Sequence, residues 1–175
     1  MKLGKVSLVP LQKEDIELVR RWRNAKHIQE YMSYREHITS QMQEKWFESL
    51  DKTKNFYYII LFENKKIGLS NIKNIDWEER CGEGGIFIYD VNFQNSVVPY
   101  MSSLLITKLA FEELKFNYTY IHVLKSNKRA IRFNKSLGYL LAPNQEDVEN
   151  QKYTLTKEKY EVTFKQLEKI VLQSI

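Results

Sequence analysis

Two groups of basic residues are the first feature of this sequence that points to chemistry. Arg20, Arg21 and Arg23 lie in one stretch, and residues 125–135 hold several more lysines and arginines. Clustered cations attract small phosphate-bearing ligands. Both groups fall on segments with helical periodicity, so solvated helix faces are the alternative interpretation.

The number and spacing of the histidines and the cysteine argue against a metal site, a catalytic triad and a disulfide. His27, His37 and His122 lack the spacing of a metal site or a catalytic triad, so we interpret all three as structural. Cys81 is the only cysteine, so the chain can form neither an internal disulfide nor a cysteine-rich metal site. We expect no bound metal and a reducing, cytoplasmic setting.

Size and charge limit the class of protein. The 175 residues carry a net charge of +5, with 43% apolar and 28% charged residues, which is a globular balance. We expect one domain over residues 1–175. The basic residues are spread along the chain, so we do not expect nucleic acid as a partner. No apolar run approaches the roughly 18 residues that cross a bilayer, so we expect no membrane association.

Hydrophobic periodicity predicts the elements that must position these residues. We expect strands over 6–11, 56–62, 67–75, 83–89, 118–124, 139–142 and 152–156. We expect helices over 14–24, 26–32, 41–50, from Pro99 onward, from a cap at Ser126 to about 137, and over 157–175. Residues 90–98 are expected to be a loop, and Thr39 to cap the third helix, in which Met42, Trp46 and Leu50 share one face. The order predicts an α/β fold with one mixed, mostly antiparallel central sheet and helices on both faces.

One segment resembles the signature helix of the GNAT family of N-acetyltransferases. It runs from Asn127 to Tyr139, with Ala130 three residues after the Asn, Phe133 in the aromatic position and a Leu-Gly-aromatic ending. The order of elements from Val6 to Thr156 is similar to that family as well. The resemblance implies the GNAT fold, acetyl-CoA as co-substrate and transfer of its acetyl group to a primary amine.

Other stretches narrow the resemblance. Arg21–Asn24, Tyr31–Met32 and Trp46–Phe47 are similar to the ribosomal-protein and spermidine acetyltransferases and to enzymes that acetylate nucleotide-linked aminosugars, including the pseudaminic-acid pathway enzyme. Ile67–Gly68 and Asn74–Trp77 are similar to the second group. The favoured acceptor is therefore a small molecule such as a nucleotide-linked aminosugar. A protein N-terminus, a polyamine, or a catalytically impaired binding domain are the alternatives, and the basic chain counts against a polyamine.

The resemblance also implies where acetyl-CoA binds. The pantetheine arm should lie along the strand at Phe87, Ile88 and Tyr89, and the pyrophosphate at the N-terminus of the next helix. The family pattern there is Gln or Arg, two residues, Gly, one residue, then Gly or Ala. Here Gln94 fits, while Val97 and Pro99 replace the small residues. The other expected cofactor contacts are Asn95, Ser96, Val98, Tyr100, Met101, Asn127, Ala130 and Phe133.

The resemblance finally implies catalytic roles. A carboxylate at the start of the fourth strand, Glu83, should act as general base through a water; a surface or salt-bridged glutamate is the alternative. Where the family often has a Tyr acid, this chain has Asn134, which can only donate a hydrogen bond to the thiolate. Tyr139 and Tyr100 are the candidate substitutes.

Three cations are candidates for binding the acceptor. If the acceptor carries a diphosphate, Arg23, Arg35 and Lys73 are the candidate cations. The oligomeric state stays open, a homodimer included.

Overall fold

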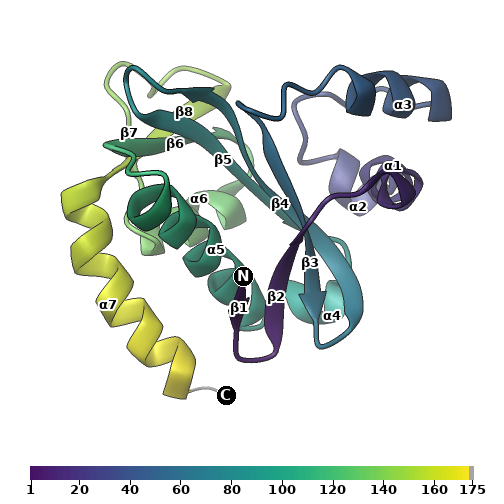
Figure 1. The fold of residues 1–175 in the computed structure, drawn as a ribbon. Coiled ribbons are helices and arrows are strands. Elements are labelled where there is room, and N and C mark those ends of the chain that lie inside the picture. The colour runs from purple at the N-terminus through teal and green to yellow at the C-terminus, as the bar shows by residue number, and fades with distance from the viewer. Residues whose placement is uncertain (174–175) are drawn as a thin grey trace.

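In the computed structural model, which describes residues 1–173, an eight-stranded sheet carries helices on both faces (Figure 1). The strand order is β1-β2-β3-β4-β5-β6-β8-β7. Within the described residues, β5 and β6 are the one parallel pair, and the other neighbours are antiparallel. The predicted mixed, mostly antiparallel sheet is confirmed.

The elements have the following bounds. The strands are β1 (Lys2–Leu3), β2 (Val6–Pro10), β3 (Phe56–Phe62), β4 (Lys65–Asp76), β5 (Cys81–Ile88), β6 (Tyr118–Leu124), β7 (Leu140–Leu141) and β8 (Asn150–Thr156). The helices are η1 (Lys13–Asp15), α1 (Ile16–Asn24), α2 (Lys26–Gln29), α3 (Ser40–Glu48), α4 (Val91–Gln94), α5 (Val98–Lys108), η2 (Leu109–Glu113), α6 (Lys128–Ser136) and α7 (Lys157–Gln173).

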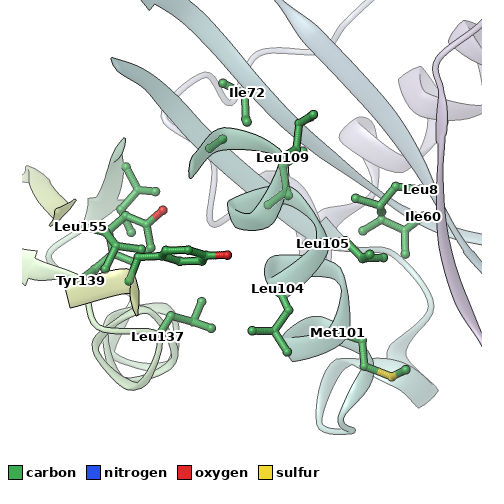
Figure 2. Close-up of a cluster of buried hydrophobic side chains, with 14 of the residues drawn as sticks. Leu8, Ile60, Ile72, Met101, Leu104, Leu105, Leu109, Leu137, Tyr139 and Leu155 are labelled. Atoms are coloured by element: carbon green, nitrogen blue, oxygen red, sulfur yellow. The ribbon is translucent and has the colours of Figure 1, made fainter. Parts of the chain in front are cut away.

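Alternating strand residues pack against different helices. Ile60 and Ile72 share a core with α5, which contributes Leu104 and Leu105, and Figure 2 shows this cluster. Ile59 and Leu69 face the opposite way and pack against α1. Because neighbouring strand residues point to opposite faces, the two sides of the sheet hold separate cores, with α1–α3 on one side and α5 and α7 on the other (Figure 1).

The sheet forks in its middle, between β5 and β6. These strands pair over only three positions: Cys81 with Tyr118, Gly82 with Thr119, and Glu83 with Tyr120. Beyond Glu83 both strands continue, β5 to Ile88 and β6 to Leu124, without pairing. The inner edges therefore present backbone groups that the ladder does not use, and the space between them is where a ligand can enter the sheet.

Three local expectations need correction. The expected loop over 90–98 contains α4, because the Asp90 side chain accepts a hydrogen bond from Asn92 N (3.1 Å) and starts a helical turn. The cap of α6 is Asn127, whose Oδ1 accepts from Ala130 N at 3.0 Å, and not Ser126. In α3, Met42 is 42% exposed, while Gln43 is 5% exposed, so the buried face of the helix differs from the expected one.

Other expectations on single elements are confirmed. Thr39 caps α3 by accepting from Met42 N at 3.2 Å. Gly138 ends α6 with φ +96, a conformation that glycine adopts without strain. The terminal helix begins at Lys157 as predicted, and the last two residues of the predicted range lie outside the described residues. No helix within residues 1–173 has the length and apolarity to cross a membrane.

Candidate active site

The fork opens into a cavity of about 840 Å³ that reaches both sides of the sheet. We divide its lining by the helices it faces. The α1 half consists of Arg23, Trp46, Tyr57, Asn71, Lys73, Glu83 and His122. The α5 half includes Gln94, Asn95, Ser96, Tyr100, Asn127, Arg129, Ala130, Arg132, Phe133 and Asn134.

Glu83 lies at the point where the strands separate and is surrounded by hydrogen-bond donors. Its side chain is 13% exposed. Oε2 accepts from Asn74 Nδ2 at 2.9 Å, while Oε1 is 3.1 Å from His122 Nδ1 and 3.5 Å from Lys73 Nζ. Glu83 and His122 come from two strands that part at this point, so the carboxylate and the imidazole meet across the opening of the fork.

The backbone of β4 explains how Asn74 reaches Glu83. The register between β4 and β5 shifts between Lys73 and Asp76, and Asn74 has φ +52. Asn tolerates this left-handed conformation better than most residues. Asn74 N also donates to the Asn55 side chain (3.2 Å), which fixes the bulge. The bulge re-aims the Asn74 amide toward the carboxylate.

Two buried donors in the α1 half lack partners. Arg23 Nε and Asn71 Nδ2 are buried and have no hydrogen-bond partner within residues 1–173. Burial lowers the pKa of the Arg23 guanidinium from its ordinary value. The neighbouring Tyr57 has a raised pKa, first because it is buried and then because of the Glu83 charge. Unpaired buried donors destabilise a protein, so a group that accepts hydrogen bonds would be stabilised against this wall.

Glycine 85 makes room for one of these donors. A Cβ at Gly85 would lie 2.7 Å from Asn71 Oδ1, closer than side chains pack. The two residues are register partners on β5 and β4. A side chain at Gly85 would therefore displace the amide from the cavity wall.

The inner edge of β5 corrects the predicted cofactor contacts. Tyr89 N donates to Ile67 O at 2.8 Å, and the register then places the backbone groups of Phe87 in the β4 ladder. Tyr89 O is bonded to His27 Nε2 at 3.0 Å. Alternation directs the backbone groups of Ile86 and Ile88 into the fork. Of the predicted Phe87, Ile88 and Tyr89, Ile88 alone has backbone groups that face the fork, where its O accepts from Gln94 Nε2, and Ile86 faces the fork as well.

The N-terminus of α5 hydrogen-bonds to a side chain of the loop that precedes it. Ser96 Oγ accepts from Val98 N (3.1 Å) and donates to Phe93 O (2.7 Å), while Pro99 has no N–H. Val97, which replaces the family's first glycine, has φ −71, so no glycine is required for this conformation. The side chains of Val98 and Met101 are 2% and 1% exposed and belong to the core, which excludes them as side-chain contacts in the cavity.

Gln94 connects the elements of the α5 half. Its Nε2 donates to Ile88 O at 2.9 Å, and its Oε1 accepts from Arg129 Nη1 at 3.3 Å. The side chain thus bridges β5 and α6 across the opening. Asn95 and Ser96 line the cavity beside it.

The signature helix contributes several side chains to the lining of the cavity. Asn127, Ala130, Phe133 and Asn134 all line it, and Phe133 packs edge-on against Tyr100, with ring centres 4.9 Å apart. Asn134 Nδ2 donates to Ala130 O at 2.8 Å, which leaves one N–H of the amide for another partner.

Two tyrosine hydroxyls near the cavity already have hydrogen-bond partners. The Tyr100 hydroxyl lies 3.2 Å from Ser136 Oγ. The buried Tyr139 hydroxyl is 2.9 Å from Thr119 Oγ1, and burial raises the pKa of Tyr139 to about 12, so the phenol stays protonated at neutral pH. A Cβ on Gly84 would be 3.6 Å from this hydroxyl, which therefore lies just behind the start of the fork.

The predicted substrate cations separate into two groups. Arg23 and Lys73 line the cavity. Arg35 is exposed, with Nε donating to Met32 O (3.1 Å), and it is not among the lining residues of the described chain.

His122, interpreted from sequence as structural, is a functional candidate that the sequence reasoning missed. Within residues 1–173, no group of three or more His, Cys, Asp or Glu side chains is arranged to hold a metal ion.

Comparisons with known proteins agree with this geometry. The family model for the acetyltransferase (GNAT) domain matches residues 5–140. Acetyltransferase PseH of Campylobacter jejuni is 26% identical over 138 residues, covering 78% of this chain and 84% of that protein.

Two solved structures share the fold. Spermidine N-acetyltransferase of Vibrio cholerae in complex with CoA and spermine has a TM-score of 0.78 and 17% identity, and the match covers 90% of this chain and 99% of that one. Apo FdhC, described as a nucleotide-linked sugar GNAT, has a TM-score of 0.78 and 20% identity, with 95% and 94% of the two chains covered.

Proposed function

This chain belongs to the GNAT acetyltransferase family, and we propose that the amine it acetylates is carried by a small anionic molecule, a nucleotide-linked aminosugar. As a member of that family it is an acyltransferase, and acetyl-CoA is its co-substrate. The acceptor is therefore the open question.

The charge of the cavity is the observation that carries the proposal. Among the lining residues of the described chain, Glu83 is the only carboxylate, and the α1 half, which we assign to the acceptor, carries the cations Arg23 and Lys73. A polyamine would meet repulsion here, because like charges in a confined cavity raise its free energy of binding. A diphosphate supplies oxygens that the free Arg23 Nε and Asn71 Nδ2 can bond.

The relatives leave the choice of acceptor to the cavity. FdhC, described as a nucleotide-linked sugar GNAT, and the spermidine enzyme match at 20% and 17% identity, a level that reflects the shared fold. PseH, at 26% identity, is an acetyltransferase. The charge of the cavity therefore decides between the two kinds of acceptor.

We assign the two halves of the cavity to the two substrates. The α5 half, with Arg129 and Arg132, suits the phosphates of acetyl-CoA, and the inner edge of β5 at Ile86 and Ile88 suits its amide-bearing arm. The α1 half suits the acceptor, whose amine would lie near the Glu83 cluster, where it can lose its proton. Asn134 and Tyr139 remain the candidates for hydrogen bonding to the leaving sulfur. The cytoplasm, where the buried Cys81 stays reduced, is the proposed setting.

A thiol-release assay with a panel of amines tests the proposal. The panel consists of a nucleotide-linked aminosugar, the free aminosugar, spermidine and a peptide with a free N-terminus. We expect the largest kcat/KM for the nucleotide-linked sugar. The largest value for spermidine would overturn the proposal. Binding of acetyl-CoA in calorimetry without thiol release for any amine would favour an impaired binding domain.

A further inference from the structure

The carboxylate of Glu83 is poorly placed to be the base itself. Its two oxygens face three donors, Asn74 Nδ2, His122 Nδ1 and Lys73 Nζ. Both oxygens are therefore engaged by the protein's own donors and are not left open to an acceptor amine. These contacts also fix its position, as expected for a group that orients a neighbour.

His122 is the neighbour that Glu83 orients. The imidazole contacts Glu83 through Nδ1, and its Nε2 has no hydrogen-bond partner in the described part of the chain. A carboxylate can only accept, so in the neutral ring the proton lies on Nδ1 and the lone pair on Nε2. The ring lines the cavity, and its side chain is 33% exposed.

We propose that Nε2 of His122 is the proton acceptor of the acetyl transfer and that Glu83 is the positioning residue that fixes its tautomer. Carboxylate–imidazole pairs of this kind hold a ring so that one nitrogen faces the substrate. The inference rests on amine acetylation as the proposed reaction, and it does not depend on which amine is the acceptor.

In the proposed reaction the amine nitrogen loses two protons, one to His122 and one to the leaving thiolate. The acceptor's ammonium gives one proton to Nε2, and the imidazolium releases it to water. The free amine's lone pair then attacks the thioester carbonyl carbon and forms the C–N bond. As the C–S bond breaks, its electron pair leaves with sulfur, and the thiolate takes the second proton from the nitrogen. The products are the amide and the CoA thiol.

The surroundings of the imidazole contain several titratable groups besides Glu83. The Tyr120 ring lies 5.8 Å from the His122 ring, and Lys152 Nζ lies 4.2 Å from the Tyr120 ring centre. The groups that face this region from the adjoining elements are Lys73 (β4), Glu83 (β5), Tyr120 (β6), Lys152 (β8), Tyr57 (β3) and Arg23 (α1). Because these groups also affect the imidazole, the test variants keep all of them except Glu83 and His122 unchanged.

Imidazole rescue tests the proposal with the acceptor that the amine panel selects. His122→Ala should lower kcat by about 10²- to 10⁴-fold, the usual loss when a general base is removed. It should abolish the rising limb of the pH–rate profile and recover turnover when imidazole is added. His122→Phe fills the same space and should not be rescued. Glu83→Gln should lower turnover but keep a rising limb, because the imidazole remains. Wild-type turnover in His122→Ala, or an unrescued variant with an unchanged rising limb, would overturn the proposal.

A measurement without substrate separates this inference from the proposed function. Nitrogen-15 NMR of the His122 ring at alkaline pH should show the proton on Nδ1 and a bare Nε2. A protonated Nε2 would overturn the role of His122 even if the panel identifies an acceptor. The expected tautomer together with no active acceptor would instead place the failure in the proposed function.

Discussion

The two halves of the cavity differ in how their polar side chains are bonded. In the α5 half, Gln94, Ser96 and Asn134 each hydrogen-bond to the protein's own backbone. In the α1 half, Arg23 Nε and Asn71 Nδ2 are buried and have no hydrogen-bond partner among residues 1–173. A ligand that bonds to Gln94 or Ser96 in the α5 half competes with existing bonds, whereas a ligand in the α1 half bonds to donors that lack a partner.

This difference predicts different sensitivities to substitution. Replacing an internal bond by a ligand bond is nearly neutral in free energy, so single changes in the α5 half should be mild. Pairing a buried, unpaired cation gains more, because its desolvation is already part of the folded state. Changes in the α1 half should therefore have the larger effects on acceptor binding.

Arg23→Met should give the largest effect. Loss of a charged hydrogen bond of about 1.5–3 kcal/mol should raise KM for an anionic acceptor by about 10- to 100-fold, with KM for acetyl-CoA unchanged. Arg35→Met is the matched control, since Arg35 is exposed outside the lining, and it should leave both KM values unchanged. Equal effects of the two substitutions would remove Arg23 from the acceptor site. Steady-state kinetics with each substrate varied in turn makes the comparison.

Gly68→Ala should affect both halves together. A Cβ at Gly68 would lie 2.3 Å from Phe87 O, so β5 must shift. Such overpacking should lower the free energy of unfolding by about 1–3 kcal/mol, and it should weaken the binding of both substrates. Gly84→Ala is the control, because its Cβ would be no closer than 3.5 Å to any neighbour. Urea unfolding measures the two stabilities, and an unchanged Gly68→Ala variant would contradict the close approach of β4 and β5.

Val97→Gly combined with Pro99→Gly should have a smaller effect, confined to the α5 half. The Ser96 cap gives this loop its own geometry, in which Val97 is unstrained. Restoring the family's small residues should therefore not tighten acetyl-CoA binding, and it should lower stability by about 1 kcal/mol through the lost proline restraint. Calorimetry with acetyl-CoA makes the test. Tighter binding would mean that the loop is only a weakened form of the family's.

Asn134→Tyr should have the smallest effect. The position lines the cavity, so a phenol there adds a proton donor beside the expected sulfur. We expect turnover equal to wild type or higher, measured by thiol release with saturating acetyl-CoA. An inactive variant that still binds acetyl-CoA would give the amide a specific task, such as holding the acceptor.

The sequence predicted local features that lie within one element. Gly138 was identified as the end of a helix from the pattern of that helix alone, whereas the cap at its start lies at Asn127, one residue after the expected Ser126. His122 was missed because its partner Glu83 is 39 residues away and meets it only where two strands diverge. The bulge that turns Asn74 toward Glu83 likewise depends on register, which the residue types do not encode locally.

Which residues of β5 face the fork also depends on the register between strands. A strand prediction gives the residues of an edge but not which of them face the neighbouring strand. Phe87 and Tyr89 were chosen for their place in the strand, while the Tyr89–Ile67 bond assigns Ile86 and Ile88 to the fork. Arg35 was chosen for its charge, and its loop carries it outside the cavity lining of the described residues.

A matched pair of acceptors tests the central claim most directly: the same aminosugar with and without its nucleotide diphosphate. If the α1 half binds an anion through Arg23 and Lys73, two charged contacts of about 1.5–3 kcal/mol each favour the nucleotide-linked form. We predict a kcat/KM at least about 100-fold higher for that form, and a ratio that falls in Arg23→Met. Equal kcat/KM values for the two acceptors in the wild-type protein would contradict an anionic acceptor.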